Sequence, residues 1–452
     1  MNQKIFREYD IRGVADRDLH DDVVRAIGVA IAETALKYSS RPIVVGRDCR
    51  LTSPRIFDAL THGLRVFADV IDIGVVPTPV AYFAQQHLHP SATVMITGSH
   101  NPAEDNGLKI MLGDRALHGA AITALGQRVA TLVACTEPPP PPRQAITTRD
   151  VVGAYLARAK DELRLGDRRL RVVVDAGNGA GGPAAIALYT ALGFDVVPLY
   201  CDFDGRFPNH HPDPTQPENL AALTLAVQHL GAEVGIALDG DADRVGAVDA
   251  TGRILWGDQL MVLLGRAVLT EVPTACFVGE VKCSQTMYDA LPSCEMWKVG
   301  HSLIKERMRE TGAALAGEMS GHLFFAHRWL GFDDGIYAGA RLLELLSRSK
   351  RALAEFVAEL PVACNTPEIR IGCPDEEKFL VVARVTERLR SDPCIRDVVT
   401  IDGARANFAD GGWGLLRASN TQAALVLRCE AATNERLAEC QTILEGHIAA
   451  SR

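Results

Sequence analysis

The chain has 452 residues, 47% of them hydrophobic and 23% charged, and a formal net charge of −9. This length exceeds what one hydrophobic core supports, so we expect several domains. The negative charge argues against a broad surface for nucleic acid or anionic membrane. The 11 cysteines include no Cys-x-x-Cys pair, and no apolar run approaches the ~20 residues of a membrane span. We therefore expect a cytoplasmic protein with reduced thiols and with neither nucleic-acid nor membrane partners.

Apolar strand-like runs alternate with helical patterns along most of the chain, which is typical of an α/β fold. The proline run from Pro138 to Pro142 predicts a stiff extended connection, and a long helical pattern runs from Ile336 to Leu360. The remainder is strand-rich and ends in a helix, which indicates a smaller α+β domain. With further boundaries near the 249–252 turn and Pro361, we predict four domains: residues 1–146, 147–250, 251–361 and 362–452.

The first polar loop that could carry chemistry is the 97–102 segment, which follows the apolar run 94–96. Gly98 lets the backbone approach a ligand closely, and Asn101-Pro102 predicts the start of a helical turn whose free N–H groups favour a phosphate. Ser99 is therefore a candidate nucleophile or phosphate carrier. An ordinary Asn-Pro turn with a structural serine is the alternative. Lys109 follows on a predicted strand that directs its ammonium group back to this loop; alternatively it is a solvated surface residue.

Two later patterns each allow two interpretations. Gly177, Gly179 and Gly182 match G-x-G-x-x-G after the apolar run 172–174, and Asp202 lies about 20 positions further on, as in dinucleotide-binding proteins. A plain strand–helix turn needs the same glycines, and we favour that turn. The pair His210-His211 suggests a metal site, but no nearby Cys or His completes one, so we favour a structural loop.

Three carboxylates alternate in Asp239-Gly240-Asp241-Ala242-Asp243-Arg244, between the apolar runs 234–238 and 245–248. This pattern predicts strand, tight loop, strand. Crowded carboxylates repel one another unless a cation lies among them, and a hard divalent ion is the natural one. An EF-hand would need Gly and Glu where Arg244 and Ala250 stand. We predict a Mg²⁺ site at Asp239, Asp241 and Asp243; a solvated acidic turn is the alternative.

Two further polar loops follow strand-like runs. The 317–322 loop offers the carboxylate of Glu318, the hydroxyl of Ser320 and the imidazole of His322, which are groups that bind sugar hydroxyls. The 417–421 loop combines the guanidinium of Arg417 with hydroxyls and an amide, a set suited to a phosphate dianion. Each could instead be a plain polar loop. Because ligands of open α/β sheets bind beyond the carboxyl ends of strands, the loops at 97–102, 239–244 and 317–322 could face one cleft.

Together and in this order, these loops resemble those of the α-D-phosphohexomutase family, of the bacterial phosphomannomutase/phosphoglucomutase type. The resemblance runs nearly end to end. It includes six further segments, at residues 6–13, 45–50, 76–79, 207–214, 298–305 and 331–335. Ala242 and Cys49 depart from it, since glycine is common in the family at both positions.

The resemblance implies three related α/β domains and a smaller C-terminal α+β domain around a central cleft. It implies that Ser99 carries a phosphoryl group and joins the three aspartates around Mg²⁺, and that Glu318 and Ser320 bind sugar hydroxyls. The non-reacting phosphate would be held by Arg417, Ser419, Asn420 and Thr421. Other implied site residues are Tyr9, Arg12, Lys109, Arg244, Lys282, His301 and His322, with Lys109 and His322 as candidates for proton transfer.

The activity implied is reversible conversion of hexose 1-phosphate and hexose 6-phosphate, for mannose and glucose, through a phosphoserine and a bisphosphorylated sugar. A sugar 1,6-bisphosphate would be the activator, and the enzyme would be a monomer or homodimer. Phosphoglucosamine mutase is an alternative, although relatives of that type tend to have Gln in place of Met319. A Mg²⁺-dependent sugar phosphohydrolase is another, and a dinucleotide-dependent oxidoreductase would rest on the three glycines alone.

Overall fold

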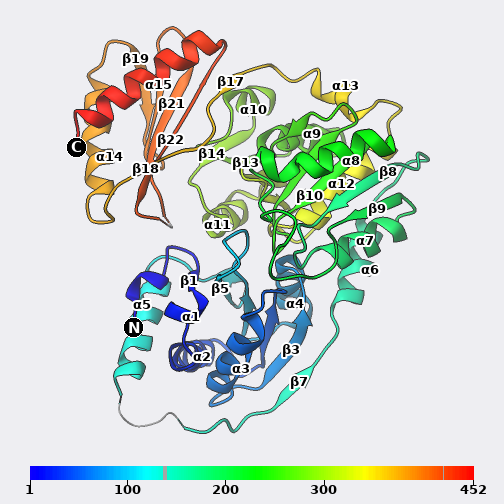
Figure 1. Cartoon of the computed structure of the whole chain (residues 1–452), viewed down its shortest axis with the longest axis vertical. Coiled ribbons are helices and arrows are strands. Elements are labelled where there is room, and N and C mark those ends of the chain that lie inside the picture. Colours follow the sequence, from blue (N-terminus) through cyan, green and yellow to red (C-terminus); the bar gives the residue numbers. More distant parts are fainter. Residues whose placement is uncertain (136–139, 421) are drawn as a thin grey trace.

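The computed structural model describes residues 1–135, 140–420 and 422–452. Its strands form four sheets, of seven, five, four and six strands, which follow one another along the chain (Figure 1). Pro138 and Pro139 of the predicted proline connection, and Thr421 of the predicted phosphate loop, lie outside the described residues. No helix among the described residues has both the length and the apolar character needed to cross a bilayer.

The first sheet has the strand order β1-β5-β4-β2-β3-β7, with β6 paired to β5. Ile43 and Val45 face a core under α2, α3 and α5, whereas Val44 faces the opposite core beside α4. Burial on both faces explains why this strand is apolar throughout. The strands are β1 (Ile11–Val14), β2 (Ile43–Arg47), β3 (Val70–Val75), β4 (Ala92–Ile96), β5 (Asp105–Leu112), β6 (Arg115–Ala116) and β7 (Ile146–Thr148). The helices are α1 (Ala15–Asp18), α2 (Asp21–Ala35), α3 (Ser53–Leu64), α4 (Thr78–Leu88) and α5 (Ala120–Ala134), after a 3₁₀ turn at Gln3–Ile5.

The second sheet has the order β12-β11-β10-β8-β9 and is also buried on both faces. Val173 faces the core under α8, and its neighbours Val172 and Val174 face the opposite core. Its strands are β8 (Arg171–Asp175), β9 (Asp195–Leu199), β10 (Val234–Leu238), β11 (Val245–Asp249) and β12 (Ile254–Leu255). Its helices are α6 (Val152–Glu162), α7 (Gly182–Ala191) and α8 (Ala221–Leu230), with a 3₁₀ turn at Pro217–Leu220.

The third sheet has the order β14-β13-β15-β16. Its strands are β13 (Phe277–Glu280), β14 (Cys294–Trp297), β15 (Leu315–Gly317) and β16 (Leu323–Phe325). Its helices are α9 (Gly257–Glu271), α10 (Gln285–Ala290), α11 (His301–Thr311), α12 (Gly335–Ser347) and α13 (Leu353–Val357). The single helix expected from residue 336 to residue 360 is wrong, because the chain turns between α12 and α13. Arg168 of the preceding domain satisfies the backbone carbonyl groups of this turn, since it donates to those of Ser349 and Arg351 at 2.8 Å each.

The fourth sheet is antiparallel, in the order β17-β22-β21-β20-β19 with β18 beside β22. Its two helices pack against the sheet over their own small core (Figure 1). The strands are β17 (Cys364–Asn365), β18 (Ile369–Gly372), β19 (Ile395–Val399), β20 (Ala404–Phe408), β21 (Trp413–Ala418) and β22 (Ala424–Ala431). The helices are α14 (Lys378–Arg390) and α15 (Asn434–Ala449).

The first three sheets share one local arrangement. In each, a strand that runs parallel to a neighbour is followed by a polar loop and then by an antiparallel partner: β4 and β5, β10 and β11, β15 and β16. The three loops, at residues 97–104, 239–244 and 318–322, coincide closely with those singled out in the sequence at 97–102, 239–244 and 317–322. Each loop thus occupies the carboxyl end of a central strand, where α/β sheets bind ligands.

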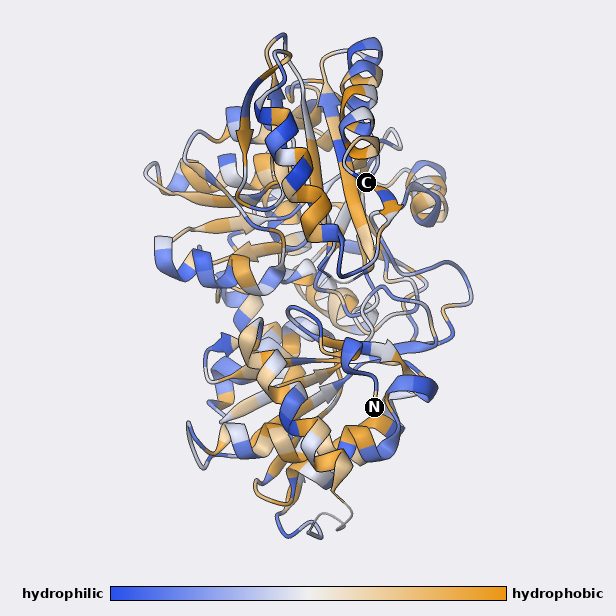
Figure 2. Ribbon diagram, turned by 90° about the vertical axis from the view of Figure 1, so that its left-hand side faces the viewer, coloured by the Kyte–Doolittle hydropathy of each residue, from blue (hydrophilic) through white to orange (hydrophobic). Residues whose placement is uncertain are grey.

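The second and third sheets are joined by one continuous apolar core. The hydroxyl of Tyr189 donates to the carbonyl of Ile336 at 2.9 Å, and that of Tyr155 lies 3.1 Å from the carboxylate of Asp334. Figure 2 shows the strands largely hydrophobic and the outer surfaces of the helices more hydrophilic, as expected for sheets covered by helices. These contacts hold the loops of different domains in fixed relation.

Candidate active site

The polar loops of all four domains line one cavity of about 1080 Å³. Most of the residues predicted for the site line it: Tyr9, Arg12, Ser99, Lys109, Arg244, Lys282, His301, Glu318, Ser320, His322, Arg417, Ser419 and Asn420. Asp239, Asp241 and Asp243 lie fully buried beneath it, in contact with Ser99 and Lys109. The structure therefore brings together residues that lie more than 400 positions apart in the sequence.

Ser99 is held at the edge of the acidic cluster. Its hydroxyl donates to Asp239 Oδ2 at 2.8 Å, and its N–H donates to Thr97 Oγ1 at the same distance. The residue has φ of +50°, a left-handed conformation that is unusual for a residue with a side chain. Such a backbone persists only where its surroundings enforce it.

The guanidinium group of Arg50 enforces that conformation. It lies fully buried inside the loop and donates to the backbone carbonyls of Ser99, Asn101, Pro102 and Asp105, at distances of 2.5–2.9 Å. Five N–H donors in a rigid plane suit a guanidinium group to this role better than an ammonium group. Gly98 leaves the space for it, because a Cβ there would lie 2.6 Å from Arg50 Cζ.

The helical turn expected after Asn101-Pro102 is wrong. The chain makes a short turn and enters β5 at Asp105, three residues after the proline. The carbonyl groups of Asn101 and Pro102 accept from Arg50, and that of Pro102 also closes the short turn by accepting from the N–H of Asp105 at 3.0 Å. The side chain of Asn101 accepts from Arg12 at 2.8 Å and donates to Asp105 at 2.8 Å, so it fixes the turn from both sides.

Asp239, Asp241 and Asp243 can each place one oxygen within 4.8 Å of the others. In Asp241, one carboxylate oxygen accepts from Thr78 Oγ1 at 2.5 Å and from Lys109 Nζ at 2.7 Å. The other oxygen, Oδ1, is buried and accepts no hydrogen bond from any described residue. A closely spaced, oxygen-only set with an unsatisfied buried acceptor fits a hard divalent cation.

The buried charges in this cluster shift one another's pKa values. Burial raises the pKa of Asp239 well above its usual range, and Asp241 and Asp243 raise it further. Burial acts likewise on Asp243, but Lys109 and His322 outweigh it and hold its pKa well below the usual range. Burial lowers the pKa of Lys109, but Asp241 and Asp243 raise it above its usual value. Lys109 therefore stays an ammonium ion and offsets part of the carboxylate repulsion.

The glycines of the 177–182 segment serve a plain strand–helix turn in this structure. A Cβ on Gly179 would lie 2.6 Å from the carbonyl oxygen of Gly240, and one on Gly182 would lie 2.2 Å from that of Cys201. At Gly179 the turn therefore packs directly against the acidic loop. Ala242, where the family often has glycine, takes φ of +59°, so it adopts the left-handed conformation despite its methyl group. His210 belongs to the same packing, because its Nε2 lies 3.0 Å from Asp175 Oδ2.

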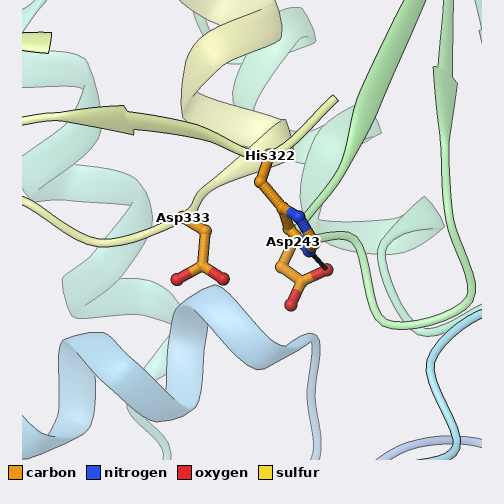
Figure 3. Close-up of side chains that lie close together, drawn as sticks. All are labelled: Asp243, His322 and Asp333. Carbon is orange, nitrogen blue, oxygen red and sulfur yellow. Dashed lines mark ion pairs between the residues drawn. The ribbon is translucent and has the colours of Figure 1, made fainter. Parts of the chain in front are cut away.

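His322 connects the acidic loop to the turn between β15 and β16. Its Nδ1 lies 2.6 Å from Glu318 Oε2, and its Nε2 lies 3.2 Å from both Asp243 Oδ1 and Arg244 Nε. Figure 3 shows His322 against Asp243, with Asp333 beside them. Burial lowers the pKa of His322, but Asp243 and Glu318 raise it to about 9, so the ring is an imidazolium that donates to Glu318 and forms an ion pair with Asp243. Burial raises the pKa of Glu318, but His322 lowers it to about 2.

The remaining polar groups of this turn also lie close to His322. Ser320 Oγ lies 3.3 Å from His322 Nδ1, and Glu318 Oε1 accepts from the N–H of Gly300 at 2.8 Å. The backbone N–H of Arg244 donates to Asp239 Oδ1 at 3.1 Å. The turn and the acidic loop thus form one hydrogen-bonded unit.

A second cationic region of the cavity lies on the fourth domain. Arg417, on β21, pairs with Asp402 Oδ2 at 3.0 Å, and the same oxygen accepts from the N–H of Val299 at 3.0 Å. Lys282 of the third domain pairs with Glu368 of the fourth at 3.2 Å. Both cations line the cavity, and each is positioned by an ion pair, of which that of Lys282 crosses the boundary between the third and fourth domains.

Tyr9 and Arg12 come from the N-terminal segment and β1. Arg12 pairs with Asp10 at 2.7 Å and donates to Asn101. Burial, and next Asp10, raise the pKa of Tyr9 to about 12, so its hydroxyl stays protonated. The Tyr9 ring contacts His301 edge-on, with 5.1 Å between centroids.

Besides Arg50, three further residues that contact the site were not predicted individually. Thr78 contacts Asp241, Lys305 contacts His301, and Asp333 contacts Lys305. Each lies in a segment that matched the family as a whole, at residues 76–79, 298–305 or 331–335. Their residue types alone mark no chemistry, because a threonine or an ion pair of this kind is common in any fold.

Comparison with known proteins agrees with this arrangement. Family models for the phosphoglucomutase/phosphomannomutase alpha/beta/alpha domains I, II and III match residues 3–131, 154–252 and 256–363, and that for the C-terminal domain matches residues 368–446. The chain belongs to the phosphoglucomutase/phosphomannomutase family. The predicted family is confirmed, and so is the fold of three related α/β domains plus a C-terminal domain.

Relatives cover almost the whole chain. It is 42% identical over 449 residues to a phosphomannomutase/phosphoglucomutase of Pseudomonas putida, covering 98% of this chain and 95% of that protein. It is 42% identical over 448 residues to a phosphoglucomutase of Neisseria gonorrhoeae, covering 98% and 96%. A crystal structure of a phosphoglucomutase/phosphomannomutase family protein from Burkholderia thailandensis superposes with a TM-score of 0.90 at 40% identity, covering 100% of this chain and 98% of that one.

Proposed function

We propose that this enzyme interconverts the 1-phosphates and 6-phosphates of mannose and glucose. The observation that carries the proposal is a single cavity lined both by Ser99, above the three aspartates, and by Arg417 with its loop on the fourth domain. We assign these as two phosphate-binding regions. A phosphohydrolase needs only the first. A mutase needs both, because the sugar carries one phosphate while the other is transferred. The names of the relatives in Pseudomonas and Neisseria support the same reaction.

In this proposal Ser99 carries a phosphoryl group and gives it to the free hydroxyl of a hexose monophosphate. A phosphorus–oxygen bond forms to the sugar as the bond to Ser99 Oγ breaks. Lys109 and His322 are the candidates for proton transfer. Ion pairs keep both protonated in the resting enzyme, so each can donate to the oxygen that leaves phosphorus and recover a proton from the attacking hydroxyl.

Asp239, Asp241 and Asp243, with an oxygen on Ser99, would hold Mg²⁺. The unsatisfied Oδ1 of Asp241 supports this assignment, because a buried carboxylate oxygen without a donor is costly unless a cation meets it. When bound, the ion offsets negative charge on the phosphoryl oxygens. Arg12 and Arg244 add positive charge at the same end of the cavity.

At the other end, Glu318 and Ser320 would bind sugar hydroxyls. The non-reacting phosphate would be held by four residues of the fourth domain: Arg417, Ser419, Asn420 and Thr421. Tyr9 and Lys282 would also bind the substrate, and His301 would be a catalytic residue. The bisphosphorylated sugar then reverses in the cavity and returns its other phosphate to Ser99, and a sugar 1,6-bisphosphate can load Ser99 in the same way.

We assign the domains to residues 1–146, 147–250, 251–361 and 362–452. The cysteines are free, which supports a reducing, cytoplasmic compartment.

A coupled mutase assay tests the proposal. It compares mannose, glucose and glucosamine 1-phosphates, each with a trace of the matching 1,6-bisphosphate and with Mg²⁺. We expect turnover of the mannose and glucose substrates without release of inorganic phosphate. Stoichiometric phosphate release would favour the phosphohydrolase, and a higher kcat/KM for glucosamine 1-phosphate than for both other sugars would favour the phosphoglucosamine enzyme.

A further inference from the structure

Beside the cavity lies a buried ion pair that has no part in the proposed phosphoryl transfer. Lys305 Nζ, on α11, lies 2.7 Å from Asp333 Oδ1, and both residues are almost completely buried. Asp333 precedes α12 and lies next to Asp243 and His322 (Figure 3). The ammonium group also lies over the ring of Tyr82, 4.0 Å from its centroid. Because a buried ion pair often adds little to the free energy of unfolding, we looked for a neighbouring side chain that this pair positions.

The third neighbour of this ammonium group is His301, the first residue of α11. Lys305 Nζ lies 3.2 Å from His301 Nδ1. The other ring nitrogen, Nε2, is buried, belongs to a residue that lines the cavity, and has no hydrogen-bond partner among the described residues. Nδ1 is therefore in contact with the ammonium group of Lys305, whereas Nε2 is available to a ligand in the cavity.

The distances distinguish the two neutral forms of this ring. An ammonium group has protons to donate and no lone pair, so Nδ1 must be the acceptor and the ring proton must lie on Nε2. The opposite tautomer would donate from Nδ1 to Asp333 Oδ2. These atoms are 3.6 Å apart, which is too long for a hydrogen bond.

We propose that Lys305, held in place by Asp333, keeps His301 neutral with its proton on Nε2, and that this N–H donates a hydrogen bond to a phosphoryl or hydroxyl oxygen of the substrate. The proposal deepens the proposed mutase function and rests on it. His301 is then a hydrogen-bond donor and not a general base. Lys305 and Asp333 are positioning residues, because they act through His301.

The charges around the ring agree with a neutral form. Burial lowers the pKa of His301 well below its usual value, and Lys305, Lys109 and His322 lower it further, whereas Asp243 raises it. Tyr9 contacts the ring from the first domain and is itself uncharged. A neutral donor needs no proton from solvent before it binds an anionic substrate.

Long-range ¹H–¹⁵N NMR of enzyme labelled with ¹⁵N-histidine reads the tautomer directly. The His301 signals are assigned by their loss in His301→Gln. We expect a protonated Nε2 and an unprotonated Nδ1 in the resting wild-type enzyme at neutral pH. A proton on Nδ1, or on both nitrogens, would overturn the proposal. The measurement needs no turnover, so it is independent of whether the mutase assay succeeds.

Two variants separate the roles of the ion pair. Lys305→Met removes the donor to Nδ1, so the ring proton should move to Nδ1 and face Asp333. Asp333→Asn leaves Lys305 next to Nδ1, so the Nε2–H form should remain. If Lys305→Met does not fold, the wild-type and Asp333→Asn spectra still show which nitrogen of His301 carries the proton. An Nδ1–H form in Asp333→Asn, or an unchanged Nε2–H form in folded Lys305→Met, would contradict the assignment to Lys305.

Kinetics test the contact with substrate. The amide nitrogen of glutamine can reach the position of Nε2, whereas that of asparagine reaches only the position of Nδ1. We expect His301→Gln to retain a kcat/KM about tenfold higher than His301→Asn, as befits one hydrogen bond to a charged acceptor. Equal losses in the two variants would refute the donor role even if the wild-type tautomer were as expected.

Discussion

The two oxygens of Asp241 have opposite surroundings. Oδ2 accepts from Thr78 and Lys109, while Oδ1 is buried without a donor among the described residues. Thr78 also donates its backbone N–H to the Asp241 carbonyl at 2.9 Å, so residue 78 holds both the backbone and the side chain of residue 241. Contacts of this kind orient metal ligands, and their loss typically weakens metal binding by about 10- to 100-fold.

We therefore expect Thr78→Val to weaken Mg²⁺ or Mn²⁺ binding about tenfold, since the isosteric change removes only the hydroxyl donor. Calorimetric titration of the metal without substrate measures this directly. Thr78→Ser should restore the affinity. Thr93→Val is the matched control, because Thr93 is also buried and donates to the side chain of Gln85 at 2.6 Å, far from the cluster. Unchanged affinity in Thr78→Val, or equal weakening in Thr93→Val, would refute the role of Thr78.

At the scale of elements, the Ser99 loop depends on a side chain from the connection between β2 and α3. The strands on both sides of the loop were predictable, because apolar runs and polar turns are local signals. The missing helical turn after Pro102 was not, because the carbonyls of the loop are held by Arg50, about fifty positions away. In the same way, Arg168 satisfies the turn that splits the expected helix between α12 and α13. Both errors arise from side-chain contacts between distant segments, which no local pattern contains.

Gly98→Ala should disrupt this loop. The new Cβ would lie 2.6 Å from Arg50 Cζ, so the guanidinium or the loop must move. We expect a loss of about 1–3 kcal/mol in the free energy of unfolding, typical of overpacking, together with reduced phosphorylation of Ser99. Chemical denaturation and intact-protein mass measure these two effects.

Gly153→Ala is the control for that substitution. Gly153 lies in α6, and a Cβ there meets no atom within 4 Å. Because alanine favours the helix over glycine, this variant should gain up to about 1 kcal/mol. If Gly98→Ala were as stable and as readily phosphorylated as the wild type, the tight packing of the loop on Arg50 would not matter.

At the scale of the molecule, the site exists only where the domains meet. Ser99 and Asp239 are 140 positions apart and their side chains share a hydrogen bond of 2.8 Å. No spacing rule in the sequence predicts such a contact. The order of several long motifs, through their resemblance to a family, did place these residues at one site, but it left the contacts of Thr78, Arg50 and Lys305 unassigned.

Arg417→Ala tests the phosphate region of the fourth domain. One phosphate-binding site must serve both isomers, because the phosphate that is not transferred occupies it in either direction of the reaction. Loss of a charge-assisted contact should lower kcat/KM for 1-phosphate and 6-phosphate sugars alike, by roughly one to two decades. Steady-state kinetics in both directions measure this. A loss confined to one direction would contradict a shared phosphate-binding site. Phosphoserine content should stay unchanged, since Arg417 is not assigned to the phosphate that is transferred.

The most direct test of the account follows a radiolabelled phosphoryl group through Ser99. The enzyme is incubated with labelled glucose 1,6-bisphosphate, the labelled peptide is mapped, and unlabelled glucose 1-phosphate is then added. We predict one label per chain on Ser99, none in Ser99→Ala, and transfer of that label to sugar phosphate. A label on another residue, or its release as inorganic phosphate, would contradict the central claim that Ser99 is the phosphoryl carrier of a mutase.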